Sequence, residues 1–152
     1  MKKFELTSEF ITNVFGTKLF RIKALVEFGN IKAGELGGYI EKEENLDQGG
    51  NAWVYGDAKV YGDAWVCGDA KVCGDAKVCG NADYAYAHGF GSEYRTTTFF
   101  RRRNGDVGVR CGCFYGTLQE FRDKVRATHK ETKKAKEYLM LADLMELRFS
   151  KE

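Results

Sequence analysis

Residues 50–85 read GNAWVY GDAKVY GDAWVC GDAKVC GDAKVC GNADYA, which is six consecutive hexads of the form Gly-(Asp/Asn)-Ala-x-(Val/Tyr)-x. Each hexad opens with a pair suited to a sharp turn, because Gly adopts positive φ and Asp or Asn bonds the local backbone. The Ala and the Val are expected to point inward from short strands. A fixed period this short predicts a parallel β-helix rather than a helical solenoid.

The repeat also predicts which residues stack. If three hexads form one triangular coil, residues 18 apart lie above one another, and six hexads give two coils. The expected stacks are Val54 with Val72, Val60 with Val78, and Val66 with Tyr84. Upstream, Ile40 and Leu46 are also six apart but stand two residues out of register with Val54, which indicates an irregular first coil.

The C-terminal part of the chain predicts a hairpin and two helices. Asn104-Gly105, a strong hairpin signal, lies between strand-like segments 99–103 and 107–110. Thr117-Leu118-Gln119-Glu120 is a capping box that should open one helix, and an apolar stripe predicts a second from about 132 to 149. The chain then divides into an N-terminal strand with an irregular first-coil cap (1–49), the hexad repeat (50–89) and a basic hairpin-plus-helices region (90–152).

Charge is unevenly distributed along the chain. The formal net charge is +2, but residues 1–94 carry −4 and residues 95–152 carry +6. An anionic ligand is therefore expected in the C-terminal half. No secretory signal follows Met1-Lys2-Lys3 and no apolar run is long enough to span a membrane, so a cytoplasmic protein with five free thiols is predicted.

The basic half contains the best candidate binding residues. Guanidinium groups on or beside the hairpin precede a glycine-punctuated turn, residues 111–117, which runs into a helix N-terminus. Free backbone N–H groups, a cap hydroxyl and stackable aromatic rings together suit a phosphate attached to a base. The alternative is a solvated basic hairpin followed by a tight turn and a good helix cap. The predicted ligand-binding residues are Arg95, Arg101, Arg103, Arg110, Phe114, Tyr115 and Thr117.

Other chemistries find weaker support. Cys67, Cys73 and Cys79 are six apart, so on a triangular coil they fall on different faces and do not converge on a metal. Cys111-x-Cys113 with distant His129 has the wrong spacing for a usual zinc site. The sequence therefore predicts no catalytic residue, no metal and no cofactor.

The aromatic residues expected to face outward from the repeat, which suggest a subunit contact, are Trp53, Tyr55, Tyr61 and Trp65.

The hexads resemble the left-handed parallel β-helix hexapeptide-repeat superfamily, whose members are typically homotrimers. The whole chain also resembles small proteins encoded by phages and prophages, through Gly37–Glu41, Gly50–Ala58 and Cys111–Phe121. The resemblance implies a mainly β fold: a short left-handed β-helix of about two to three coils, followed by the C-terminal hairpin and two α-helices.

Some phage left-handed β-helix proteins act as sponges that bind the nucleotide second messengers of host immune systems. The resemblance thus implies a non-catalytic anti-defence protein that sequesters a small anionic (cyclic) nucleotide second messenger in the cytoplasm of an infected bacterial host. No long nucleic acid is expected as a partner. Two alternatives stay open: a structural or protein-interaction module that inhibits a host defence protein, and an acyltransferase of the hexapeptide-repeat type with His88 as its base.

Overall fold

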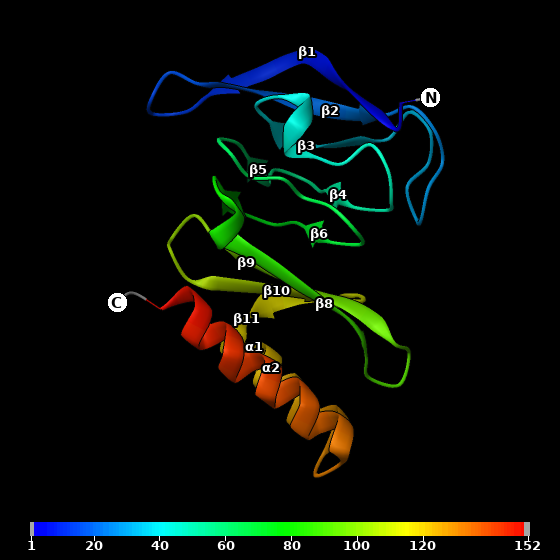
Figure 1. The fold of residues 1–152 in the computed structure, drawn as a ribbon, viewed down its shortest axis with the longest axis vertical. Helices are drawn as coiled ribbons and strands as arrows, with labels where there is room; N and C mark the ends of the chain where they lie inside the picture. The colour runs from blue at the N-terminus through cyan, green and yellow to red at the C-terminus, as the bar shows by residue number, and fades with distance from the viewer. Residues whose placement is uncertain (1, 151–152) are drawn as a thin grey trace.

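The structure is a computed structural model that describes residues 2–150. It is an elongated stack with the N-terminal strands at one end, the hexad repeat in the middle, and a sheet with two helices at the other end (Figure 1). In chain order the elements are β1 (Phe4–Thr12), β2 (Lys18–Ala24), β3 (Leu36–Ile40), the 3-10 turn η1 (Glu43–Asn45), β4 (Trp53–Val54), β5 (Lys59–Val60), β6 (Lys71–Val72), β7 (Lys77–Val78), the 3-10 turn η2 (Asn81–Asp83), β8 (Tyr84–Phe90), β9 (Arg95–Arg101), β10 (Val107–Cys111), β11 (Phe114–Thr117), α1 (Leu118–His129) and α2 (Lys133–Phe149).

The hexad strands pair in parallel at the predicted interval. Strands β4 and β6 form a two-stranded sheet with Val54 opposite Val72. Strands β5 and β7 pair within the five-stranded sheet with Val60 opposite Val78. Both stacks are confirmed. The five glycines at positions 50, 56, 62, 68 and 74 all have positive φ, between 57° and 66°, which explains why each hexad begins with Gly.

The predicted left-handed parallel β-helix is nevertheless wrong as the fold. The structure consists of a mixed five-stranded sheet, an antiparallel four-stranded sheet and a parallel two-stranded sheet, not of one regular parallel β-helix. The antiparallel strands β1, β2 and β3 join the repeat through β3, which pairs in parallel with β5. Hexad strands of two residues form too few bonds to define a sheet alone, so the longer flanking strands decide the architecture.

The third predicted stack does not form a strand pair. Val66 bridges to Leu46, and Tyr84 begins β8, which pairs antiparallel with β9, although Val66 and Tyr84 belong to the same hydrophobic core. Gly80, the first residue of the sixth hexad, has an extended φ of −159°. The positive-φ glycine turn that opens each earlier hexad is therefore missing there. The offset of two residues upstream is confirmed, because Ile40 pairs with Val60 and Leu46 with Val66.

The C-terminal hairpin and helices are confirmed. Strands β9 and β10 pair antiparallel around the turn at Asn104-Gly105, within the four-stranded sheet β11-β10-β9-β8. Thr117 caps α1 as predicted: its side chain accepts from the Glu120 N–H, and the Glu120 carboxylate accepts from the Thr117 N–H. Strand β8 pairs with β9 across the boundary that the sequence suggested at residue 89.

Strand β9 separates two hydrophobic cores. Its neighbouring residues Phe99 and Phe100 point to opposite faces, Phe99 into the core under the helices and Phe100 into the core of the repeat. Trp53, expected to face outward, is fully buried because Phe4 and Phe28 of the N-terminal segment pack against its ring. The hexad pattern alone does not reveal this N-terminal cover. Among residues 2–150, no helix is long and apolar enough to cross a membrane.

Candidate functional site

A polar groove of about 620 Å³ runs between the hexad repeat and the C-terminal sheet. We call it the anion groove. Three parts of the chain line it: the loop between β2 and β3, the outward positions of two hexads, and the β9–β10–β11 region. Its residues are Gly29, Asn30, Ile31, Asn51, Tyr55, Asp69, Lys71, Arg95, Thr96, Arg110, Gly112 and Cys113.

Two of its cations are Arg95 and Arg110, which adjacent strands β9 and β10 supply. Arg110 donates from Nε to the Gly112 carbonyl at 2.7 Å, and its guanidinium lies 5.1 Å from the centre of the Tyr55 ring. Both contacts fix the planar group, which leaves its terminal N–H groups as donors for an anion. The Arg95 guanidinium packs over Gly112, a residue with φ 58° whose missing Cβ makes room for it.

The third cation is Lys71, at the outward position of strand β6. No carboxylate of residues 2–150 lies within 4.0 Å of the charged nitrogens of Lys71, Arg95 or Arg110. The groove contains one carboxylate, Asp69, which lies 3.9 Å from His88 Nδ1. The groove is therefore lined by three cationic side chains against one anionic side chain.

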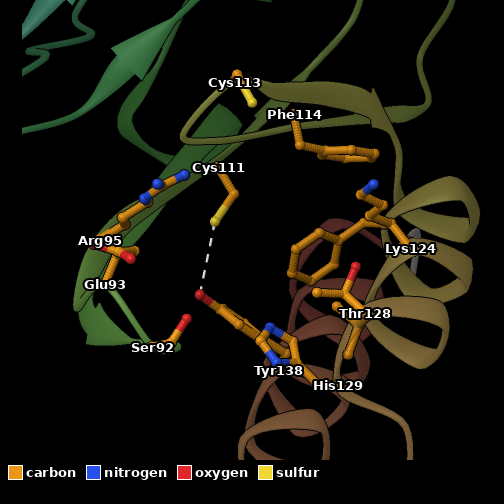
Figure 2. Close-up of a pocket in the computed structure, with 12 residues that line it drawn as sticks. Ser92, Glu93, Arg95, Cys111, Cys113, Phe114, Lys124, Thr128, His129 and Tyr138 are labelled. Atoms are coloured by element: carbon orange, nitrogen blue, oxygen red, sulfur yellow. Dashed lines mark hydrogen bonds between the residues drawn. The ribbon is translucent and has the colours of Figure 1, made fainter.

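A second cavity of about 290 Å³ lies between the C-terminal sheet and the helices. We call it the helix-side cavity. Figure 2 shows Arg95, Glu93 and Ser92 on one side of it, Phe114, Lys124 and Thr128 on the other, and Tyr138 with His129 at its base. Its remaining lining residues are Cys111, Cys113, Phe121 and Val125. Arg95 and Cys113 line both cavities.

Burial shifts the pKa of two groups near these cavities, Tyr138 and Cys73. It raises the pKa of the Tyr138 hydroxyl, which lies 3.7 Å from Cys111 Sγ and donates to the Phe90 carbonyl at 3.0 Å. Burial also raises the pKa of the Cys73 thiol, although the Arg110 guanidinium acts in the opposite direction. Tyr138 is therefore a neutral donor and Cys73 a protonated thiol at neutral pH.

The structure brings together only some of the residues predicted to bind the ligand. Arg95 and Arg110 line the anion groove, and Phe114 lines the helix-side cavity with Arg95. Arg103 lies in a separate pocket with Tyr39, Lys59 and Asp75.

The other three predicted residues have structural partners outside both cavities. Arg101 donates from Nε to Asp83 at 3.2 Å and from Nη2 to the Phe149 carbonyl. Tyr115 stacks on Phe100, with 6.2 Å between ring centres, and donates to Asp75. The Thr117 hydroxyl is occupied by the cap of α1. The contacts of Arg101, Tyr115 and Thr117 therefore agree with the structural alternative, a hairpin followed by a tight turn and a helix cap, and not with ligand binding.

His88 has a geometry unlike that of a catalytic triad. Its Nδ1 lies 2.7 Å from Thr96 Oγ1 and 3.9 Å from Asp69. In a triad the carboxylate and the hydroxyl use different ring nitrogens, whereas here both partners approach the same one. Among residues 2–150, no three His, Cys, Asp or Glu side chains gather in an arrangement that would hold a metal ion. The five cysteines, Cys111 and Cys113 among them, are free thiols.

Sequence reasoning missed the contributions to the groove from outside the basic half. Lys71 is one of several hexad lysines, and only the pairing of β6 with β4 distinguishes it from Lys77. Asn30 belongs to no motif, and Asn51 was interpreted only as a turn residue of the first hexad. Tyr55 was predicted to be an exposed aromatic, and its half-buried position beneath Arg110 has no signal in the sequence.

In comparisons with known proteins, no protein-family model matches the chain, and no curated protein is similar to it in sequence.

Proposed function

We propose that the protein binds a small anionic nucleotide, with the phosphate in the anion groove, and sequesters it without chemical change. The observation that carries the proposal is the convergence of Lys71, Arg95 and Arg110 in one groove, free of carboxylate partners within residues 2–150. Arginine in particular suits phosphate, because its planar fork forms two parallel hydrogen bonds to two phosphate oxygens.

The shape and composition of the groove support the same proposal. Its volume of about 620 Å³ falls within the range of small-molecule sites. Asn30, Asn51 and Thr96 add amide and hydroxyl groups that can hydrogen bond to a sugar. Since Lys71 comes from the repeat and both arginines come from the C-terminal sheet, the packing of the repeat against this sheet would hold the three cations together.

Sequestration rather than turnover is proposed because the groove offers no paired acid and base around the cations. Its one carboxylate, Asp69, lies 3.9 Å from His88 Nδ1, and His88 is not among the residues that line the groove. From the resemblance of the sequence to small phage proteins, we further propose that the ligand is a cyclic nucleotide second messenger, that the protein acts in an infected bacterial cell, and that it assembles as a homotrimer.

Titration calorimetry with a panel of cyclic mono- and dinucleotides tests the binding. We expect at least one to bind with a Kd at or below the micromolar range, and chromatography of the ligand recovered after denaturation should return it intact. Absence of binding across the panel would refute the proposal, and recovery of a cleaved ligand would refute sequestration. Light scattering of the purified protein tests the trimer separately.

A second function has an observation of its own. Helix α2 exposes an apolar stripe at Met140, Leu144 and Leu147, which are 71%, 53% and 72% exposed. Their spacing places them on one helix face, the arrangement of a protein-docking surface. This favours the alternative that the protein inhibits a host defence protein. Replacing the three residues by Gln should then abolish inhibition in an infection assay while leaving nucleotide binding unchanged.

A further inference from the structure

We infer that the helix-side cavity takes the base of the same nucleotide whose phosphate occupies the anion groove. The inference rests on the proposed function and specifies where the two ends of the ligand lie. It makes the site bipartite, with a cationic compartment on one side of Arg95 and an aromatic compartment on the other.

The anion groove and the helix-side cavity share a wall. Arg95 and Cys113 are the two residues that line both cavities, so the compartments lie next to each other. Arg95 is an exposed side chain with no hydrogen-bond partner among residues 2–150, and it packs over Gly112 rather than extending into solvent. From this position the Arg95 guanidinium can contact a ligand in the anion groove and a ligand in the helix-side cavity.

The walls of the two cavities differ in polarity. The surface of the helix-side cavity is mainly apolar, whereas that of the anion groove is mainly polar. Phe114, Phe121 and Tyr138 supply aromatic surface on which a planar ring can stack. At about 290 Å³ the cavity lies just below the usual range for whole-ligand sites, a size that suits one flat ring system rather than a complete nucleotide.

Polar groups lie around the aromatic walls of the helix-side cavity. Glu93, Ser92 and Thr128 line the cavity with one carboxylate and two hydroxyls. Figure 2 shows Ser92 and Glu93 on the sheet side of this space and Thr128 on the side of α1. A carboxylate accepts from an exocyclic amino group, and hydroxyls both donate and accept, so these groups can read the edge of a base that stacks between the walls.

The aromatic walls are also held rigidly, which reduces the entropy cost of binding. Phe121 contacts Phe99 and Tyr138 edge to face, with ring centres 6.0 Å and 5.5 Å apart. The Tyr138 hydroxyl is fixed by its bond to the Phe90 carbonyl. The compartment is therefore formed by packing within the chain and is available before a ligand enters.

The test compares adenosine 5′-monophosphate with ribose 5-phosphate, which carry the same phosphate but differ in the base. Calorimetry on the full chain should show the nucleotide binding about tenfold more tightly, the contribution expected of one stacked base. Thr128→Trp, at an exposed position of α1 that lines the cavity, should remove this difference by filling the space. Ala127→Trp, exposed on the same helix but outside both cavities, should preserve it.

A second readout uses the cysteines. Adenosine 5′-monophosphate should slow alkylation of Cys113 by N-ethylmaleimide, while exposed Cys79, outside both cavities, reacts at an unchanged rate. Equal affinities for the two phosphates would overturn the bipartite site and leave phosphate binding in the groove standing. Failure of both phosphates, and of every cyclic nucleotide, to bind would overturn the proposed function and this inference with it.

Discussion

Replacing Arg110 by Ala is the substitution that distinguishes the structural site from a generally basic surface. Arg110 lies in the anion groove, held by the Gly112 carbonyl and the Tyr55 ring. Arg103, which the sequence favoured equally, lies in a different pocket. Arg103→Ala is therefore a matched control, because it removes the same charge and the same side chain at a position outside the groove.

The magnitude follows from the contacts that Arg110 can offer. A hydrogen bond to a charged group contributes about 1.5–3 kcal/mol, and each 1.4 kcal/mol changes the Kd tenfold. Arg110→Ala should therefore raise the Kd for the bound nucleotide by about 10- to 150-fold. Arg110→Lys should give an intermediate loss, since it keeps the charge but lacks the planar fork.

The effect on folding should be small by comparison. Loss of the contact between Arg110 and the Tyr55 ring costs about 0.5–1 kcal/mol at a partly exposed site. Calorimetry for the Kd and urea unfolding for stability measure the two effects separately. Equal losses of affinity for Arg110→Ala and Arg103→Ala would refute the reasoning, because binding would then depend on net charge and not on the groove.

Three further predictions concern neighbouring features. Gly112→Ala should lower stability by about 1–2 kcal/mol, since φ there is 58°, and should weaken nucleotide binding by displacing Arg95; calorimetry with unchanged affinity would contradict this. Thr117→Ala should cost about 1 kcal/mol through loss of the Glu120 N–H cap yet leave the Kd unchanged, and a raised Kd would restore Thr117 to the site. Burial lowers the pKa of Lys3 to about 8, so between about pH 8 and its ordinary 10.5 the unfolded chain binds a proton that the folded chain does not. The stability of the native protein relative to Lys3→Met should therefore rise across this window in urea titrations, and a constant difference would contradict the assignment.

Local features of the fold were predictable because they depend on short segments. The hexad register, the hairpin at Asn104-Gly105 and the capped helices all follow from residues close together in the chain. The architecture was not predictable in the same way. Whether β8 continues the repeat or turns to pair with β9 depends on the partner strand, and the letters of the sixth hexad still match the pattern at Tyr84.

The site follows the same division. Arg95 and Arg110 were identifiable as basic residues near a hairpin, but their separation from Arg101 and Arg103 depends on tertiary contacts. Arg101 is neutralised by Asp83, which lies in the 3-10 turn η2 of the sixth hexad. Lys71 joins the groove only because the repeat packs against the C-terminal sheet, where its backbone N–H donates to the Thr98 hydroxyl at 2.9 Å.

The central claim is that Lys71, Arg95 and Arg110 form a nucleotide-binding groove. The most direct measurement equilibrates the native protein and the Arg95→Ala/Arg110→Ala double variant with the cyclic-nucleotide panel, removes free ligand by gel filtration, and quantifies what each releases on denaturation by mass spectrometry. We expect an intact nucleotide from the native protein and a loss of at least about 90% of it in the folded double variant, since each arginine contributes tenfold or more. Equal release from both proteins, or none from the native protein, would contradict it.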